Sequence, residues 1–145
     1  MTDTEVDTIL QHEIGEIKAG QLLGDDWEDM LANMPRSHAE IMARAVRDHI
    51  ADAVSTLPQL IKNAEPAQMH FYFANLSSMR KVIFPSLMDA YKEWHEHNDL
   101  SPIKKLLGKA EKHWLTLAQS LMALYKKHGD DSYARMESLI KSNYL

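Results

Sequence analysis

The chain has 145 residues, of which 45% are hydrophobic and 26% are charged, as expected for a globular protein of about one domain. It contains no cysteine, which excludes disulfides, thiolate metal sites and cysteine nucleophiles. The formal net charge of −5 is unevenly distributed, because residues 1–35 hold nine Asp or Glu against one Lys, whereas residues 101–145 hold eight Lys or Arg against four Asp or Glu. This asymmetry predicts either pairing between the two ends or a charged face that binds a partner.

Neither a targeting segment nor a membrane span is expected. The first residues are acidic and lack the basic and apolar regions of a secretion signal. The longest uncharged run near the C-terminal end, residues 113–125, is too short to cross a bilayer. We therefore expect a cytoplasmic protein with no membrane contact.

The first predicted helix covers Thr4 to about Leu23. Its large apolar residues repeat at spacings of three and four, which predicts one buried face formed by Val6, Ile9, Leu10, Ile14 and Ile17. Gly15 and Gly20 weaken this helix by up to about 1 kcal/mol each relative to Ala. We expect them to allow close approach of a neighbouring helix. A short acidic helix at 25–34 follows and ends before Pro35.

The third predicted helix begins at a capping box of Ser37 and Glu40. We expect it to end before Pro58, since proline lacks the N–H of a regular helical turn. A connector with one helical turn follows at 59–65. Residues 66–84 then read as one helix that is apolar on more than one face, and Pro85 kinks or breaks it before a continuation at 85–98.

Residues 101–129 predict one long amphipathic helix, with Ser101 as its N-cap and Gly129 at its C-terminal end. At about 1.5 Å per residue it is roughly 40 Å long, so shorter helices can pack along it. Its apolar residues form one broad stripe, consisting of Ile103, Leu107, Ala110, Trp114, Leu117, Ala118, Leu121, Leu124 and Tyr125. A last short helix is expected from Asp130 to about Asn143.

No hairpin signal and no alternating apolar pattern appears in the sequence. We therefore predict an all-α fold, with residues 1–145 forming a single-domain bundle of six to eight helices around the long C-terminal helix.

The eight histidines raise the question of a metal site. Asp89, Glu93 and His97 are spaced by four and share one helical face, and His12 and Glu16 form a second pair of this spacing. Carboxylate and imidazole ligands on facing helices build metal sites in helical bundles, but such sites use a different spacing inside the core. We interpret both sets as solvated faces, and expect no metal and no cofactor.

Arg44 and His49 lie in the sequence Arg-Ala-Val-Arg-Asp-His, which resembles the Arg-x4-His motif of HEPN-type ribonucleases. That family is also all-α, and the resemblance implies that His49 moves the proton of a 2′-hydroxyl while Arg44 stabilises the phosphate. Ala45 stands where the family prefers a polar residue. The alternative is an exposed Arg44 beside a His49 at the edge of the core.

Four lysines of the long helix lie opposite its apolar stripe, namely Lys105, Lys109, Lys112 and Lys127. Such a row can follow a phosphate backbone without reading bases. The sequence pI of about 5.9 is far below that of typical nucleic-acid-binding domains. Solvated lysines are therefore the alternative interpretation.

No phosphate-binding loop, nucleophile elbow or zinc-protease motif is present. The sequence therefore favours a non-enzymatic helical interaction protein, acting as a subunit, adaptor or regulator of a larger complex through a protein partner or self-association. The alternatives are a nucleoprotein subunit that contacts the nucleic-acid backbone and a HEPN-like ribonuclease.

Overall fold

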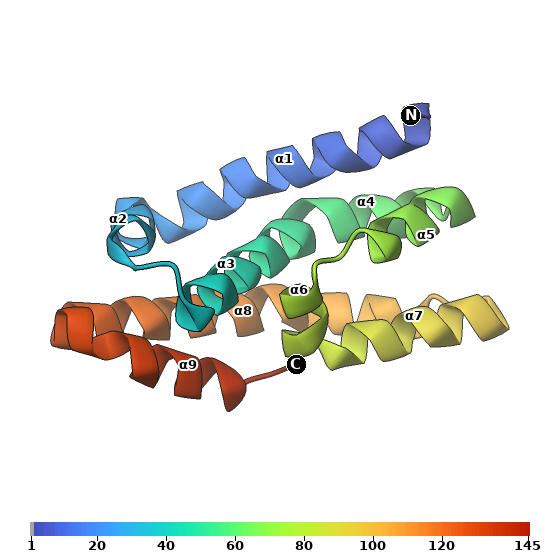
Figure 1. The fold of residues 1–145 in the computed structure, drawn as a ribbon. Coiled ribbons are helices and arrows are strands. Elements are labelled where there is room, and N and C mark those ends of the chain that lie inside the picture. Colours follow the sequence, from blue (N-terminus) through green and yellow to red (C-terminus); the bar gives the residue numbers. More distant parts are fainter. Residues whose placement is uncertain (1) are drawn as a thin grey trace.

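A computed structural model describes residues 2–145, and this part of the chain consists of helices joined by short turns, with no strand (Figure 1). The helices in chain order are α1 (Asp3–Leu23), α2 (Asp25–Asn33), α3 (His38–Ala51), η1 (Asp52–Thr56), α4 (Leu57–Asn63), α5 (Pro66–Ala74), α6 (Ser78–Ile83), α7 (Pro85–His97), α8 (Ser101–His128), η2 (Gly129–Ser132) and α9 (Tyr133–Lys141). α3, η1 and α4 follow one another without a break and form one continuous helical segment. The predicted all-α fold with one long helix near the C-terminus is confirmed.

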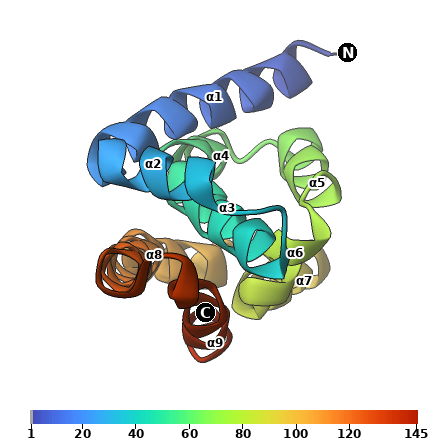
Figure 2. The ribbon, with the colours of Figure 1, turned by 60° about the vertical axis from the view of Figure 1, so that its left-hand side comes forward.

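α3 lies in the middle of the molecule, with α1 on one side and α8 on the other (Figures 1 and 2). α7 runs beside one half of α8, and α9 turns back beside the other half and also contacts α3. The C-terminal residue is held against the middle of the chain, because the backbone N–H of Leu145 donates to the carbonyl of Ile83 at 3.1 Å. One continuous apolar core therefore joins the N- and C-terminal helices.

The long helix α8 buries most of the predicted stripe, with Trp114, Ala118 and Leu121 fully enclosed. Gly129 ends it with a φ of 56°, as predicted for a glycine at this position. The predicted N-cap is displaced by one residue. Ser101 is the first helical residue, and its backbone N–H donates to the Asp99 carboxylate at 2.9 Å.

The prediction that Pro58 ends the third helix is wrong, since the helix continues to Asn63. The turn before the proline widens into the π-helix η1, in which the N–H of Leu57 reaches the carbonyl of Asp52 five residues earlier. Pro58 stands near the start of the next helical segment, where a missing N–H costs little. The widened turn thus accommodates the proline within a continuous run of helix, and single-turn π-helices often occur at functional sites.

Residues 66–84 form two helices rather than the predicted single one. α5 ends at Ala74, and the chain turns at Asn75 before Ser77 caps α6 by accepting from the N–H of Arg80. This N-cap at Ser77 favours the start of a new helix after the turn. In residues 2–145, no helix is long and apolar enough to cross a membrane.

Candidate functional site

A buried carboxylate, Asp52, lies at the centre of a polar cluster between α1, η1, α5 and α6. Asp52 is the first residue of the π-helix and is fully enclosed. Its Oδ2 accepts a hydrogen bond from the Tyr72 hydroxyl at 2.7 Å and another from the Arg80 guanidinium, and its Oδ1 lies 2.9 Å from Nδ1 of His12. Three donors thus replace the water that a buried carboxylate loses.

Burial and nearby charges also shift the pKa values of Tyr72 and Arg80, the two residues that donate to Oδ2 of Asp52. Burial raises the pKa of the Tyr72 hydroxyl, and the negative charge of Asp48 raises it further, so the phenol remains a donor at neutral pH. Burial lowers the pKa of Arg80, while the charges of Asp48 and Glu16 oppose this change. The guanidinium remains the counterion of Asp52, since arginine stays protonated in proteins.

The exposed edge of the cluster carries His12, Glu16 and Asp48. Nε2 of His12 lies 3.2 Å from Oε1 of Glu16, one turn away on α1. One ligand-type atom from each of the three residues lies within 4.8 Å of the other two, and within residues 2–145 this is the one such group of His, Asp and Glu. The sequence spacing identified the pair His12 and Glu16, but it held no signal that Asp48 and Asp52 join them.

A groove opens beside His12, between the start of α1 and the end of α5. It has a volume of about 410 Å³, which lies in the range of small-molecule sites. Its lining combines apolar side chains with the polar atoms of the cluster, and consists of Thr8, Ile9, His12, Thr56, Phe71, Tyr72, Asn75 and Arg80. The charged cluster is therefore accessible to solutes from this side.

The structure places Arg44 and His49 in different surroundings. His49 is buried and stacks on Trp114, with its Nε2 at 2.8 Å from the carbonyl of Arg80. Burial, together with the charge of Arg80, lowers its pKa to about 3. Arg44 is exposed and pairs with Glu40 one turn away. The two side chains do not form the joint site that the HEPN resemblance implies, and His49 has no access to a substrate.

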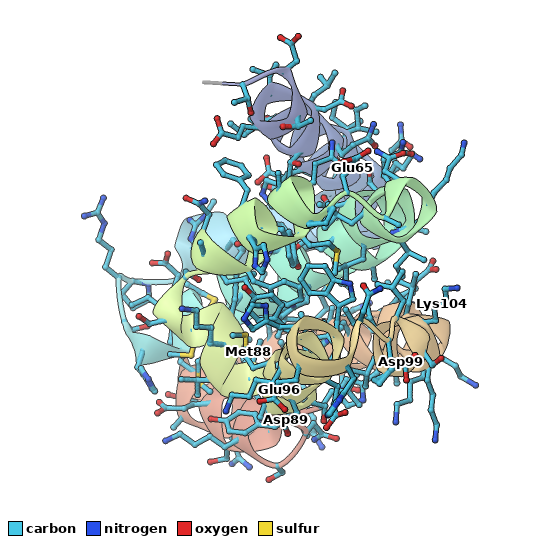
Figure 3. All side chains as sticks on the ribbon, turned by 90° about the vertical axis from the view of Figure 1, so that its right-hand side faces the viewer. Glu65, Met88, Asp89, Glu96, Asp99 and Lys104 are labelled. Atoms are coloured by element: carbon cyan, nitrogen blue, oxygen red, sulfur yellow. The ribbon has the colours of Figure 1, made fainter. Side chains whose placement is uncertain are left out.

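The predicted set Asp89, Glu93 and His97 lies on the exposed side of α7. His97 approaches Glu93 only to 3.9 Å and Glu96 to 3.8 Å, and all of these side chains are exposed. Asp89 and Glu96 lie on one side of this helix in Figure 3. Within residues 2–145, the three predicted residues do not form a group of closely spaced ligand atoms.

Lys105, Lys109, Lys112 and Lys127 are exposed, and within residues 2–145 none of them forms an ion pair. Lys109 and Lys112 border a groove of about 340 Å³ between α8 and α9, where His113 is fixed by the carbonyl of Asn143. On the other side, Lys105 and Lys109 border a groove that also holds acidic residues of α7, namely Asp89, Glu93 and Glu96. The lysine row is therefore accessible, but its N-terminal half lies beside negative charge.

The predicted buried face of α1 is wrong, because Val6, Ile9, Leu10 and Ile17 are exposed and the fifth predicted residue, Ile14, is only partly buried. Val6, Leu10 and Ile17 are 50%, 52% and 64% exposed. The buried residues of α1 are Thr8, Gly15, Ala19 and Leu23, of which the first three are small. Small residues allow the backbones to approach closely, and this approach outweighs burial of the larger side chains. We call the exposed row of Val6, Ile9, Leu10 and Ile17 the outer face of α1.

Residues 1–143 match the DUF6866 C-terminal domain, a family of unknown function, and the chain belongs to this family. Neither curated proteins nor solved structures gave a significant match to the chain.

Proposed function

We propose that this DUF6866 domain is a non-enzymatic cytoplasmic interaction protein, and that a helix of a partner protein binds the outer face of α1. The exposed row of large apolar side chains on that helix is the observation that carries the proposal. Contiguous exposed apolar surface on a soluble protein marks contact sites for other macromolecules. The row spans about three turns of α1, which is the length that a partner helix needs for apolar anchors at successive turns.

The charge around the outer face favours a basic partner. Asp3, Asp7 and Glu13 are exposed on α1, and α2 adds further acidic side chains, whereas Lys18 is the one basic residue of residues 1–35. A second copy docking α1 against α1 would bring these acidic groups together, which opposes association. A helix with an apolar stripe between lysines or arginines complements both the shape and the charge.

Binding of a synthetic peptide tests this proposal. The probe is an amphipathic helix with leucines at every third and fourth position and lysines on both sides, and its counterpart carries glutamates in place of the lysines. We expect the basic peptide to bind and the acidic one to fail in a fluorescence-anisotropy titration. The double variant Leu10→Asp/Ile17→Asp should weaken binding by about tenfold or more, since both anchors are lost.

The substitutions also separate apolar contact from simple charge attraction. Aspartate makes the surface more negative, so a purely electrostatic contact would become stronger in the double variant. Ile41→Asp is the matched control, because Ile41 is equally exposed but lies on α3. Binding that is unchanged in the double variant, or equally lost in the control, contradicts the proposal. Self-association in analytical ultracentrifugation that the double variant abolishes would assign the face to a second copy instead.

Nucleic-acid backbone contact is the second candidate, and the exposed and unpaired state of the lysine row in residues 2–145 favours it. Such contacts release counterions and are strongly salt-dependent. Lys109→Glu/Lys112→Glu should abolish binding of a single-stranded oligonucleotide at low salt, while Lys62→Glu, at an exposed lysine on α4, should not. Absence of binding to the unmodified protein at low salt would eliminate this candidate.

A further inference from the structure

We propose that His12, Glu16 and Asp48 form a binding site for one divalent transition-metal ion, with Zn²⁺ as the ion to test. The three residues come from α1 and α3, and their ligand-type atoms lie within 4.8 Å of one another. One imidazole nitrogen and two carboxylates are ligands that zinc and related ions accept in proteins. This site does not depend on the proposed function, because none of its three ligands belongs to the outer face of α1.

The backbone brings these ligands together at a point of unusually close helix contact. Gly15 lies between the two α1 ligands, and a β-carbon there would stand 2.4 Å from the carbonyl oxygen of Ala51. The missing side chain lets α1 approach the junction of α3 and η1, where Asp48 lies. His12 and Glu16 are four residues apart, so they share the face that this approach turns toward Asp48.

The buried carboxylate of Asp52 determines which nitrogen of His12 is available. Asp52 accepts hydrogen bonds from Tyr72 and from the Arg80 guanidinium, and this cationic partner favours the acceptor-only carboxylate form. Nδ1 of His12, at 2.9 Å from Asp52, therefore carries the proton and donates it. A carboxylate that orients a histidine through its second nitrogen is the usual support of a metal-binding imidazole.

In this tautomer, the lone pair of His12 Nε2 faces the carboxylate of Glu16. In the neutral imidazole this nitrogen is an acceptor, and Oε1 of Glu16 at 3.2 Å is also an acceptor. Two acceptors at this distance repel each other unless a cation, either a proton on Nε2 or a metal ion, lies between them. Two ligand atoms about 2.0–2.1 Å from a zinc ion lie roughly 3.3 Å apart in a tetrahedral arrangement, so the observed separation fits a shared metal ion.

The charges around the site leave room for a cation. Glu16, Asp48 and Asp52 contribute three negative charges, and the two guanidinium groups of Arg47 and Arg80 contribute two positive ones. Arg80 is committed to Asp52, and Arg47 reaches Asp48 only at 3.4 Å. With a neutral imidazole the net charge of these groups is negative, so the site still attracts a cation. The two arginines reduce the affinity for that cation but do not occupy its position.

Solvent reaches the three side chains, which supports a site that keeps an open position. The side chains of His12 and Glu16 are 27% and 37% exposed, and that of Asp48 is 22% exposed. Water can therefore complete the coordination, as in zinc sites with three protein ligands. His12 also lines the neighbouring groove.

Isothermal titration of the full chain with Zn²⁺ tests the proposal, with Mg²⁺ as the comparison ion. We expect one zinc ion per chain and weaker binding of magnesium, because imidazole is a poor ligand for Mg²⁺. His12→Ala should weaken zinc binding by about tenfold or more. His97→Ala is the matched control, since His97 also stands four residues from a glutamate but lacks a buried carboxylate and a third ligand.

Glu16→Gln keeps the size of the side chain but removes a carboxylate ligand. It takes the place of His12→Ala in the zinc titration if His12→Ala fails to fold. The ¹⁵N resonance of His12 Nε2 should shift on addition of one equivalent of zinc, while Nδ1 keeps its proton. Zinc binding that His12→Ala leaves unchanged, or that His97→Ala removes equally, overturns the proposal. So does an imidazole that carries protons on both nitrogens and shows no response to zinc, because the shared cation is then a proton.

Discussion

Gly15 of α1 packs directly against the carbonyl group of Ala51 at the end of α3. A β-carbon at position 15 would lie 2.4 Å from the carbonyl oxygen and 2.9 Å from the carbonyl carbon. These are backbone atoms, so no side-chain rotation can relieve the contact. The approach fixes the position of α1 and, with it, the distance from His12 to Asp52.

Gly15→Ala should therefore destabilise the protein, although alanine favours helix. We expect a loss of about 1–3 kcal/mol in the free energy of unfolding, as for other overpacked sites. Gly20→Ala is the control on the same helix, because nothing lies within 4 Å of a β-carbon there. It should stabilise by about 0.5–1 kcal/mol. Urea denaturation of both variants gives the comparison, and equal effects would contradict the close packing of α1.

Asp52→Asn should be among the most damaging single substitutions. It leaves the guanidinium of Arg80, whose side chain is only 11% exposed, without its counterion. Removal of one partner from a buried ion pair costs about 3–5 kcal/mol. Tyr72→Phe removes only one hydrogen bond to the same carboxylate and should cost about 1–3 kcal/mol. A smaller loss for Asp52→Asn than for Tyr72→Phe, measured by urea unfolding, would show that the carboxylate is not the centre of the cluster.

His49 should make stability depend on pH. Burial and the charge of Arg80 lower its pKa from 6.5 to about 3, so between these values the unfolded chain binds a proton that the folded chain does not. Stability therefore falls as the pH decreases through this range. His49→Gln keeps a donor for the carbonyl of Arg80 but does not titrate.

Between pH 7 and pH 5, unmodified protein should lose about 2 kcal/mol more than the His49→Gln variant. Urea unfolding at the two pH values measures the difference. The other titrating groups are common to both proteins and cancel. Equal pH dependence in the two proteins would mean that His49 is protonated in the folded state.

Leu10→Ala tests the orientation of α1 independently of any partner. Leu10 is 52% exposed, so its truncation should change the free energy of unfolding by no more than about 0.5 kcal/mol. Leu121→Ala, at a fully buried leucine of α8, should cost about 2–5 kcal/mol. If Leu10→Ala costs about as much as Leu121→Ala, Leu10 is buried, as the sequence periodicity predicts.

The sequence by itself determined the helical class, the extent of α8 and its division into a buried stripe and a lysine face, because these follow from local spacing and from the residues that begin and end a helix. It also identified the pair His12 and Glu16, since a spacing of four places two side chains on one helical face.

Only the tertiary structure decided which face of α1 is buried. Apolar periodicity favours the row that contains Leu10, but the small side of the helix around Gly15 permits a closer backbone contact. The tertiary structure also decided that Asp48 and Asp52 join His12, since they lie more than thirty positions away in the chain. Long-range packing brings these groups together, and no local pattern encodes it.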